Sequence, residues 1–370
     1  MLKPISDLRL KSLDALRGFD MFWIMGVDHI FHQLGEATGS SFWHVLDHQF
    51  QHPDWHGFAV YDLIFPLFLF LAGVAMPYSI GKKLEAGLAR SEVLYGLVKR
   101  GLILVLLGVI YNNGLEVRGL DEIRFPSVLG RIGLAYMFAG FIYVYTKQRS
   151  QVLWCITLLL GYWLLLMLGS ASGYPRGDLT EEGNIVSYVD RIILPGQLYR
   201  GIHDPEGLLA TIPAVSTALM GILAGTFLEN TGTDRGKQNA LTMAFVGIAF
   251  VAVAQLWNLS FPINKNLWTS SFAMQCGGLS LMLLAFFYFL IDVKGWTKWA
   301  FFFRVIGMNS IFIYMSPCFI DWQYTSSKLF GWMTDITAEP YKPVIMTISL
   351  VGVQWLFLYF LYRNKVFLRI

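Results

Sequence analysis

The stretch HVLDHQFQHPDWHGF places a histidine at every fourth position: His44, His48, His52 and His56. Side chains four residues apart lie on one face of an α-helix, and two histidines at that spacing are a familiar way to bind zinc. Pro53 argues against one continuous helix, because proline is tolerated only in the first turn of a helix. We therefore expect the run to divide near His52, and we predict no metal site.

Residues 40–50, which precede the proline, predict a short helix at the membrane surface with Ser40 or Ser41 at its N-cap. Its apolar side chains would face the membrane, while His44 and His48 would face water. These two histidines are then surface residues rather than part of a site.

His52 has a different potential partner, because Asp62 follows ten residues later at the start of an apolar segment. A carboxylate beside a histidine fixes the tautomer of the ring and raises its basicity, an arrangement used in general acid–base catalysis. The spacing alone does not distinguish such a pair from two independent side chains.

The elements that must position these residues are membrane-spanning helices. Of the 370 residues, 55% are hydrophobic and only 14% are charged, which is too apolar for a soluble domain. Apolar runs of about 20 residues, the length that crosses the hydrocarbon layer, occur at 13–34, 58–80, 91–112, 127–146, 151–169, 207–229, 239–258, 267–291, 299–321 and 343–362. We therefore predict an all-α polytopic membrane protein with about ten transmembrane helices.

The distribution of Lys and Arg sets the orientation, because short loops rich in these residues stay in the cytoplasm. Basic residues are more frequent in the terminal segments and in the loops near 82–90, 147–149, 235–237 and 294–298 than in the intervening loops. Both termini are therefore expected in the cytoplasm. Topology explains these cations, so the net charge of +3 gives no reason to expect a nucleic-acid partner.

The chain is expected to form one transmembrane domain over residues 1–370. An outer loop at 35–57 would carry the surface helix and His52, and a long outer loop would cover 170–206. The three cysteines lie within predicted spans without metal or disulfide spacing, so we interpret them as packing residues.

Charged residues inside the first span are costly in lipid and are expected to face the interior of the bundle. At about 100° per residue, Asp14, Arg17, Asp28 and His32 fall on one helical face. A helix rises by roughly 16 Å between Arg17 and Asp28, so this polar stripe would suit a channel for a long polar ligand. The alternative is a structural Asp14–Arg17 pair with Asp28 already in water.

Further cations lie in the inner half of the bundle: Lys99 and Arg100 in the third span, and Arg304 in the ninth. They could hold phosphate groups, although snorkelling to lipid head groups explains Lys99 and Arg100 as well. Arg131 lies near the outer end of the fourth span. Asn309 lies about mid-membrane, where its amide must find partners within the bundle.

Several segments form an ordered series of motifs: RLKSLDALRGFDMFWIMGVDH, QHPDWHGFAVYDLIFPLFLFLAG, RFPSVLGRIGLAY, HDPEGLLATIPAVSTALMGILAG, PINKNLWTSSF, and IDVKGW followed by GMNSIFIY. This series closely resembles the heparan-alpha-glucosaminide N-acetyltransferase family and its bacterial homologues over residues 9–320. Members of that family are polytopic membrane enzymes that pass acetyl from cytoplasmic acetyl-CoA to the amine of a terminal glucosamine across the membrane.

The resemblance also implies roles for single residues. The family's H-x-x-W-x-G-x-x-x-x-D-L-x-F-P motif matches this sequence with His52 as the catalytic histidine and Asp62 as the motif's acid. Asp28 takes the place of a polar residue, commonly Asn, at the outer end of the first span. An ionised carboxylate at that place cannot donate a hydrogen bond to a developing oxyanion.

The resemblance implies acetyl-CoA as co-substrate and no metal. Different residues along the bundle would then bind different parts of acetyl-CoA. Arg17, Lys99, Arg100 and Arg304 would meet the nucleotide and phosphates, and the pantetheine arm would follow the polar stripe. Asn309 or Asp28 would position the thioester or the acceptor. His52 would either take a proton from the amine or accept the acetyl group, and both routes need a neutral imidazole.

On the acceptor side, several polar residues lie at or near the outer ends of spans: Arg124, Arg131, Asp204, Glu206, Asn264, Lys265 and Asn266. Carboxylates suit a protonated aminosugar, and Asn and Arg suit hydroxyls. Helix capping explains Asp204 and Asn266 equally well, as solvation explains Lys265. A homodimer is what the resemblance implies, and a bacterial inner membrane is the expected location.

Other functions compete with this interpretation. A bundle with polar midplane residues would also suit an aminosugar or N-acetylglucosamine permease, although the sequence reveals no inverted repeat or interrupted pair of helices. The histidine run could instead belong to a metal-dependent hydrolase, and O-acetylation of a glycan is a further alternative.

Overall fold

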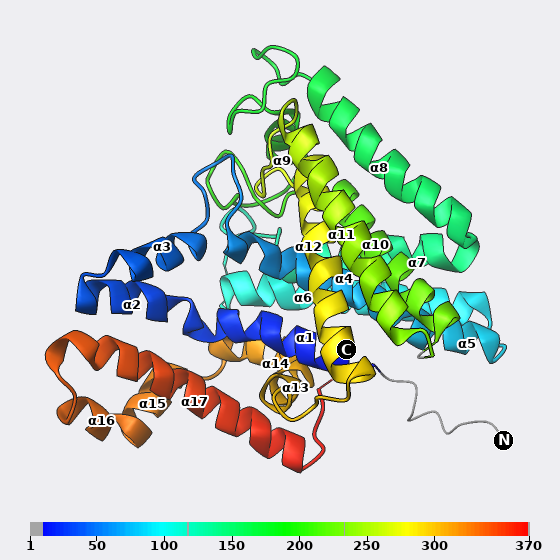
Figure 1. The fold of residues 1–370 in the computed structure, drawn as a ribbon. Coiled ribbons are helices and arrows are strands. Elements are labelled where there is room, and N and C mark those ends of the chain that lie inside the picture. The colour runs from blue at the N-terminus through cyan, green and yellow to red at the C-terminus, as the bar shows by residue number, and fades with distance from the viewer. Residues whose placement is uncertain (1–9, 117, 233, 369–370) are drawn as a thin grey trace.

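The computed structural model describes residues 10–116, 118–232 and 234–368. The described residues are mostly helical and contain no strand, apart from a single antiparallel bridge between Arg124 and Gly196 (Figure 1). The predicted all-α class is confirmed. The helices are α1 Lys11–Phe22, α2 His29–Thr38, α3 Ser41–Gln49, α4 Ile64–Met76, α5 Lys82–Glu85, α6 Arg90–Asn113, α7 Val128–Tyr145, α8 Gln148–Leu168, α9 Ile185–Ile193, α10 Thr211–Thr231, α11 Gly236–Asn258, α12 Ser270–Tyr288, α13 Phe301–Gly307, α14 Ser310–Met315, α15 Trp322–Phe330, α16 Trp332–Asp335 and α17 Lys342–Arg363.

Within this described part, 8 helical stretches are long and apolar enough to cross a membrane, and a bent pair would make a ninth. The 8 stretches are Val60–Glu85, Arg90–Asn113, Val128–Tyr145, Gln148–Leu168, Thr211–Thr231, Gly236–Asn258, Ser270–Val293 and Glu339–Arg363. They match the predicted spans from 58–80 to 267–291 and the last one at 343–362. The polytopic membrane architecture is therefore confirmed.

The first predicted span is helical but not straight. A π-helical turn, Trp23–Val27, separates α1 from α2, and Gly26 within it has a φ of 106°, which favours glycine. The non-helical Gly26 breaks the helical register, so the four polar residues do not form one stripe. Asp28 interacts with the Tyr61 hydroxyl, and His32 lies 3.1 Å from Asp47 of α3.

The ninth predicted span is also broken, contrary to the expectation of uninterrupted helices. α13 and the stretch Ser310–Cys318 meet at an angle of 68°. Asn309 occupies the break, where its amide donates to the Val366 carbonyl at 3.1 Å and accepts from the Leu368 N–H at 2.9 Å. The expected partners of Asn309 are thus backbone groups of the C-terminal segment.

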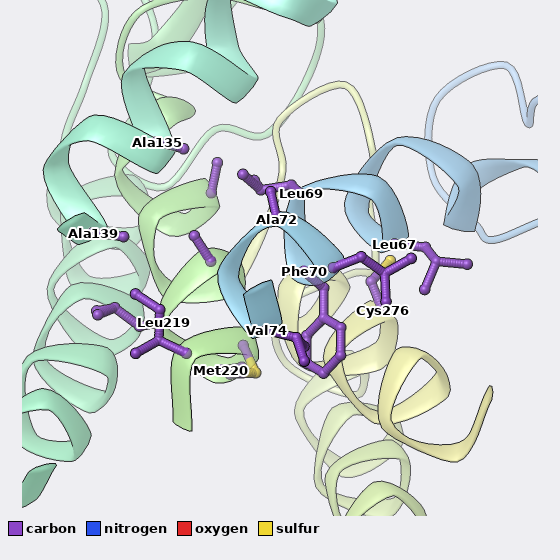
Figure 2. Packing of buried hydrophobic residues seen from close by; sticks show 14 of the residues in the cluster. Leu67, Leu69, Phe70, Ala72, Val74, Ala135, Ala139, Leu219, Met220 and Cys276 are labelled. Atoms are coloured by element: carbon purple, nitrogen blue, oxygen red, sulfur yellow. The ribbon is translucent and has the colours of Figure 1, made fainter. Parts of the chain in front are cut away.

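The centre of the bundle is α4, which packs against α10, α12 and α7 (Figure 2). Figure 2 shows the α4 side chains Leu67, Phe70 and Val74 among residues of α7, α10 and α12. Glycines allow α4 and α10 to approach closely, because a Cβ on Gly73 would lie 2.2 Å from the Ala218 carbonyl oxygen. In contrast, α8 lies at the edge of the bundle (Figure 1) and exposes a row of apolar side chains.

The contact between α1 and α13 provides a stability prediction. A Cβ on Gly18 would lie 1.7 Å from the Phe303 carbonyl oxygen, a backbone atom that cannot move aside alone. Gly18→Ala should therefore destabilise the fold by about 1–3 kcal/mol or more through overpacking, seen as a lower melting temperature of the purified protein in detergent. Gly161→Ala on α8, where a Cβ meets nothing within 4 Å, is the control. Equal melting temperatures for both variants would contradict this packing.

Four of the predicted outer segments are in contact with one another. They are the segment that carries His52, the long loop at 170–206, the loop between α11 and α12, and the loop between α6 and α7. The Trp55 indole donates to the Leu179 carbonyl at 2.8 Å, and the Gly57 N–H donates to the Ile263 carbonyl at 2.9 Å. The antiparallel bridge between Arg124 and Gly196 joins the loop between α6 and α7 to the long outer loop. That both termini are cytoplasmic stays a prediction, and residues 1–9 and 369–370 lie outside the described residues.

Candidate active site

His52 and Asp62, predicted as partners, lie together at the outer end of α4. His52 Nδ1 is 2.6 Å from Asp62 Oδ1. Asp62 is fully buried in the 3-10 turn Val60–Leu63, and its other oxygen accepts the Ala59 N–H at 2.9 Å. An ionised carboxylate only accepts hydrogen bonds, so beside it Nδ1 of His52 is the donor, and in a neutral ring Nε2 then carries the lone pair.

Lys265 completes this group from the loop between α11 and α12. Its Nζ lies 2.8 Å from His52 Nε2 and 3.6 Å from Asp62 Oδ1. Burial lowers the pKa of Lys265, while the nearby Asp62 carboxylate acts in the opposite direction. The Lys265 Nζ lies within hydrogen-bonding distance of both ring nitrogens of His52, 3.2 Å from Nδ1 and 2.8 Å from Nε2.

The other histidines of the run have separate surroundings. His44 and His48 are exposed on α3, which begins at Ser41 as expected. His56 Nδ1 lies 3.1 Å from the Asn264 amide, and burial lowers the pKa of His56. In the described ranges, no three side chains among His, Cys, Asp and Glu come together as metal ligands. The fourfold spacing thus divides between elements, as Pro53 predicts.

An outer cavity of about 320 Å³ opens between the outer loops. Its wall includes His52, Asp62 and Lys265, the carboxylate Glu206, and the side chains Trp55, Tyr199 and Asn266. Arg124 also lines the cavity and binds both Asp204 (2.8 Å) and Glu206. A volume of this size, with acidic, amide and aromatic groups on one wall, suits a small polar ligand such as a sugar.

The structure separates the predicted acceptor residues into two groups. Glu206, Lys265, Asn266 and Arg124 line the outer cavity. The other three are buried and bonded within the protein. Asp204 accepts from Arg124 and from the N–H groups of Tyr199 and Glu206, Arg131 donates to the Gly207 carbonyl and stacks on Trp268, and Asn264 accepts from the Leu267 N–H. None of these three residues lines the outer cavity, and their contacts hold the loops around it.

An inner cavity of about 520 Å³ lies at the opposite end of the bundle. Its wall carries Asp14, Arg17, Lys82 and Arg100, together with Tyr78 and Ser79. Arg100 stacks on Tyr136 with its guanidinium carbon 4.4 Å from the ring centre. Three cations around one cavity form an anion-binding surface.

Not every predicted inner residue joins this cavity. Lys99 is exposed on α6 and does not line this cavity. Neither Arg304 nor Asn309 belongs to the described part of the cavity wall, and Asn309 is occupied by the C-terminal segment. Lys82, in contrast, lines the inner cavity, although the basic residues near 82–90 of the sequence predicted only the orientation in the membrane. Its position could have predicted this role, because Lys82 lies one helical turn after Tyr78 and Ser79 at the inner end of the second span.

A middle cavity of about 240 Å³ lies between the other two. It shares Phe68, Ser310 and Ile311 with the inner cavity, so α14 lines both. It shares six residues with the outer cavity: His52, Tyr111, Val128, Glu206, Lys265 and Tyr314. We call these six residues the shared wall. Apolar residues, among them Met21 and Ile24 of the first span, replace the polar stripe expected here.

Two buried groups in the long outer loop predict opposite responses to pH. Burial raises the pKa of Asp190 from 3.8 to about 6 and lowers the pKa of His203 from 6.5 to about 4. Asp190 therefore loses stabilisation as the pH rises from about 4 to 6, because the folded loop holds the proton that the unfolded loop releases. His203 loses stabilisation as the pH falls from about 6.5 to 4, because the unfolded loop gains a proton first.

The two contributions should largely cancel in the wild type. In the His203→Gln variant only the Asp190 contribution is left, so hydrogen exchange in residues 180–206 should slow as the pH falls from 6 to 4, once corrected for the intrinsic exchange rate. The Asp190→Asn variant should show the reverse. Slopes of the same sign in both variants would contradict these assignments.

Comparison with known proteins shows what the chain as a whole is similar to. Residues 9–119 match a family described as a domain of unknown function, DUF5009. Over 98% of its length, the chain is 27% identical to the human heparan-alpha-glucosaminide N-acetyltransferase, and the mouse protein of the same name gives the same values. The chain spans 60% of the length of these relatives. Over nearly its whole length, this membrane protein is therefore similar to heparan-alpha-glucosaminide N-acetyltransferases, which confirms the resemblance drawn from its motifs.

Proposed function

We propose that this protein is a transmembrane acetyltransferase. It moves acetyl from cytoplasmic acetyl-CoA to the amine of a glucosamine-type sugar or glycan end on the outer side. The observation that carries the proposal is the series of three adjoining cavities, with the His52–Asp62 pair where the middle and outer cavities meet. The similarity to N-acetyltransferases supports the same reaction class. As the resemblance implies, the protein works as a homodimer, and we place it in a bacterial inner membrane.

The donor binds from the inner side. Arg17, Lys82 and Arg100 neutralise the phosphates of acetyl-CoA at the inner cavity, since guanidinium and ammonium groups bind phosphate oxygens well. The narrow pantetheine arm extends through the middle cavity past Phe68 and Ile311, which line both cavities. The thioester then reaches the shared wall without the nucleotide leaving the inner side.

His52 performs the chemistry in this proposal. With Nδ1–H donated to Asp62, the free Nε2 lone pair takes a proton from the acceptor amine or accepts the acetyl group itself. Asp62 is a positioning residue, because its buried oxygens fix the tautomer and orientation of the ring.

The acceptor binds from the outer side. Glu206, held by Arg124, attracts the protonated amine, while Trp55 and Tyr199 offer flat apolar surfaces to a sugar ring. Asn266 supplies an amide for hydroxyl groups. The amine loses its proton to solvent before it attacks, since only the neutral form is nucleophilic.

The test is transfer of labelled acetyl from acetyl-CoA to glucosamine by the purified protein in proteoliposomes. We expect N-acetylglucosamine to form only when acetyl-CoA has access to the inner face. Glucosamine and N-acetylglucosamine are offered separately as acceptors, so labelling of the second would indicate O-acetylation instead.

The broken helices favour one competing function, an aminosugar permease, because interrupted helices are typical of transporter binding sites. The same vesicles separate the two hypotheses. Uptake of unmodified N-acetylglucosamine, with no acetyl transfer above background, would overturn the enzyme hypothesis in favour of the permease.

A further inference from the structure

Lys265 is the one cationic side chain that the described residues place on the shared wall. Arg124 and Arg200 line the outer cavity, and Arg17, Lys82 and Arg100 line the inner one. A thioester that reaches His52 through the middle cavity therefore meets a single positive charge, the Lys265 ammonium, 2.8 Å from Nε2.

The loop that carries Lys265 is held in place from several sides. The Asn264 N–H donates to Thr269 Oγ1 at 3.0 Å, and the Gly57 N–H of the His52 segment donates to the Ile263 carbonyl. The Tyr162 hydroxyl donates to the Leu267 carbonyl at 2.6 Å. These bonds fix the position of Lys265 relative to His52.

The same loop contains a strained residue. Trp268 has a φ of 47°, which is unusual for a residue with a side chain, and its indole is fully buried against Phe65 and Arg131. Strain of this kind persists only where the surrounding structure over-determines it, and it concentrates at functional sites. The backbone strain at Trp268 therefore occurs in the same loop that holds Lys265 beside His52.

The tyrosines near His52 have partners of their own. Tyr111 and Tyr314 stack at 4.6 Å and bond to each other, and the Tyr61 hydroxyl interacts with Asp28. Asp28, as a carboxylate, cannot donate. Acyl transfer nevertheless requires a donor aimed at the carbonyl oxygen, where negative charge develops.

We propose that Lys265 is a catalytic residue that donates a hydrogen bond from Nζ to the thioester carbonyl oxygen. This inference rests on the proposed acetyltransferase function and assigns its oxyanion donor. In the resting site Nζ lies 2.8 Å from Nε2 and 3.2 Å from Nδ1 of His52, and it turns to the carbonyl oxygen when the acetyl group arrives.

The reaction balances with Lys265 protonated throughout. In direct transfer, the amine nitrogen forms a bond to the carbonyl carbon while Nε2 of His52 takes the amine proton. The C–S bond then breaks, the thiolate leaves, and His52 returns the proton to the sulfur. The products are the acetamide and free CoA thiol, and the oxyanion bonded to Lys265 becomes the amide oxygen.

The test compares Lys265→Met, Lys265→Arg and the surface control Lys328→Met. We expect Lys265→Met to lower kcat by about 10²–10³-fold, the usual loss for an oxyanion donor, with the KM for acetyl-CoA unchanged because the inner cavity is intact. Since burial lowers the pKa of Lys265, the wild type should lose activity on the alkaline side as the ammonium deprotonates. Lys265→Arg should keep partial activity and shift this alkaline loss to higher pH, because guanidinium stays charged.

The outcomes separate the two proposals. A wild type without acetyl transfer overturns the proposed function and the role of Lys265 with it. An active wild type overturns only the role of Lys265 if the Met variant keeps its kcat. If the melting temperature shows that Lys265→Met does not fold, the Lys265→Arg variant tests the role of Lys265 instead. An unshifted alkaline loss in that variant would also overturn the oxyanion role.

Discussion

His52→Ala should lower kcat for acetyl transfer by at least about 100-fold, the lower end of what a positioned general base contributes. The change removes Nε2, the proton acceptor or acetyl carrier, at the wall shared by the middle and outer cavities. Steady-state transfer to glucosamine measures kcat, and isothermal titration of acetyl-CoA should show unchanged binding because the inner cavity is intact.

His48→Ala is the matched control, because His48 is exposed on α3 and belongs to the same histidine run. It should leave kcat unchanged. Equal losses in both variants, accompanied by stoichiometric zinc in the wild type, would instead indicate a metal site built from the run.

Asp62→Asn should lower kcat nearly as much as His52→Ala, although it changes few atoms. Asp62 accepts two donors, the His52 ring N–H and the Ala59 backbone N–H, from a fully buried position. An Asn side chain has one acceptor oxygen, so its NH₂ group would face one of these donors, and Lys265 would lose its carboxylate at 3.6 Å. Replacement of the buried Asp in a serine-protease triad costs about 10⁴ in kcat through the wrong tautomer, which sets the upper limit here.

Asp47→Asn provides a second His–Asp pair as the control, because Asp47 lies 3.1 Å from His32 and away from the three cavities. It should keep wild-type kcat. An Asp62→Asn variant with unchanged kcat would mean that His52 needs no partner to hold its tautomer. The measurement again is acetyl transfer at saturating acetyl-CoA.

Much of the architecture follows from local sequence. Eight predicted spans appear as helices, because a run of about 20 apolar residues has no other stable form in lipid. Pro53 divides the histidine run as proline geometry requires, and α3 lies where the surface helix was expected. The sequence also predicts the His52–Asp62 pair through its motif, since both residues lie on one short segment.

Only the tertiary structure decided which polar residues share a cavity. A helical wheel assumes a straight helix, so it placed Asp28 and His32 on one face with Arg17, and the left-handed Gly26 removed that face. Lys265 is more than 200 positions from His52 in sequence, and its place beside the ring depends on the contacts that hold its loop. Local propensity specifies elements, whereas proximity between distant loops arises from packing and hydrogen bonds that no local pattern encodes.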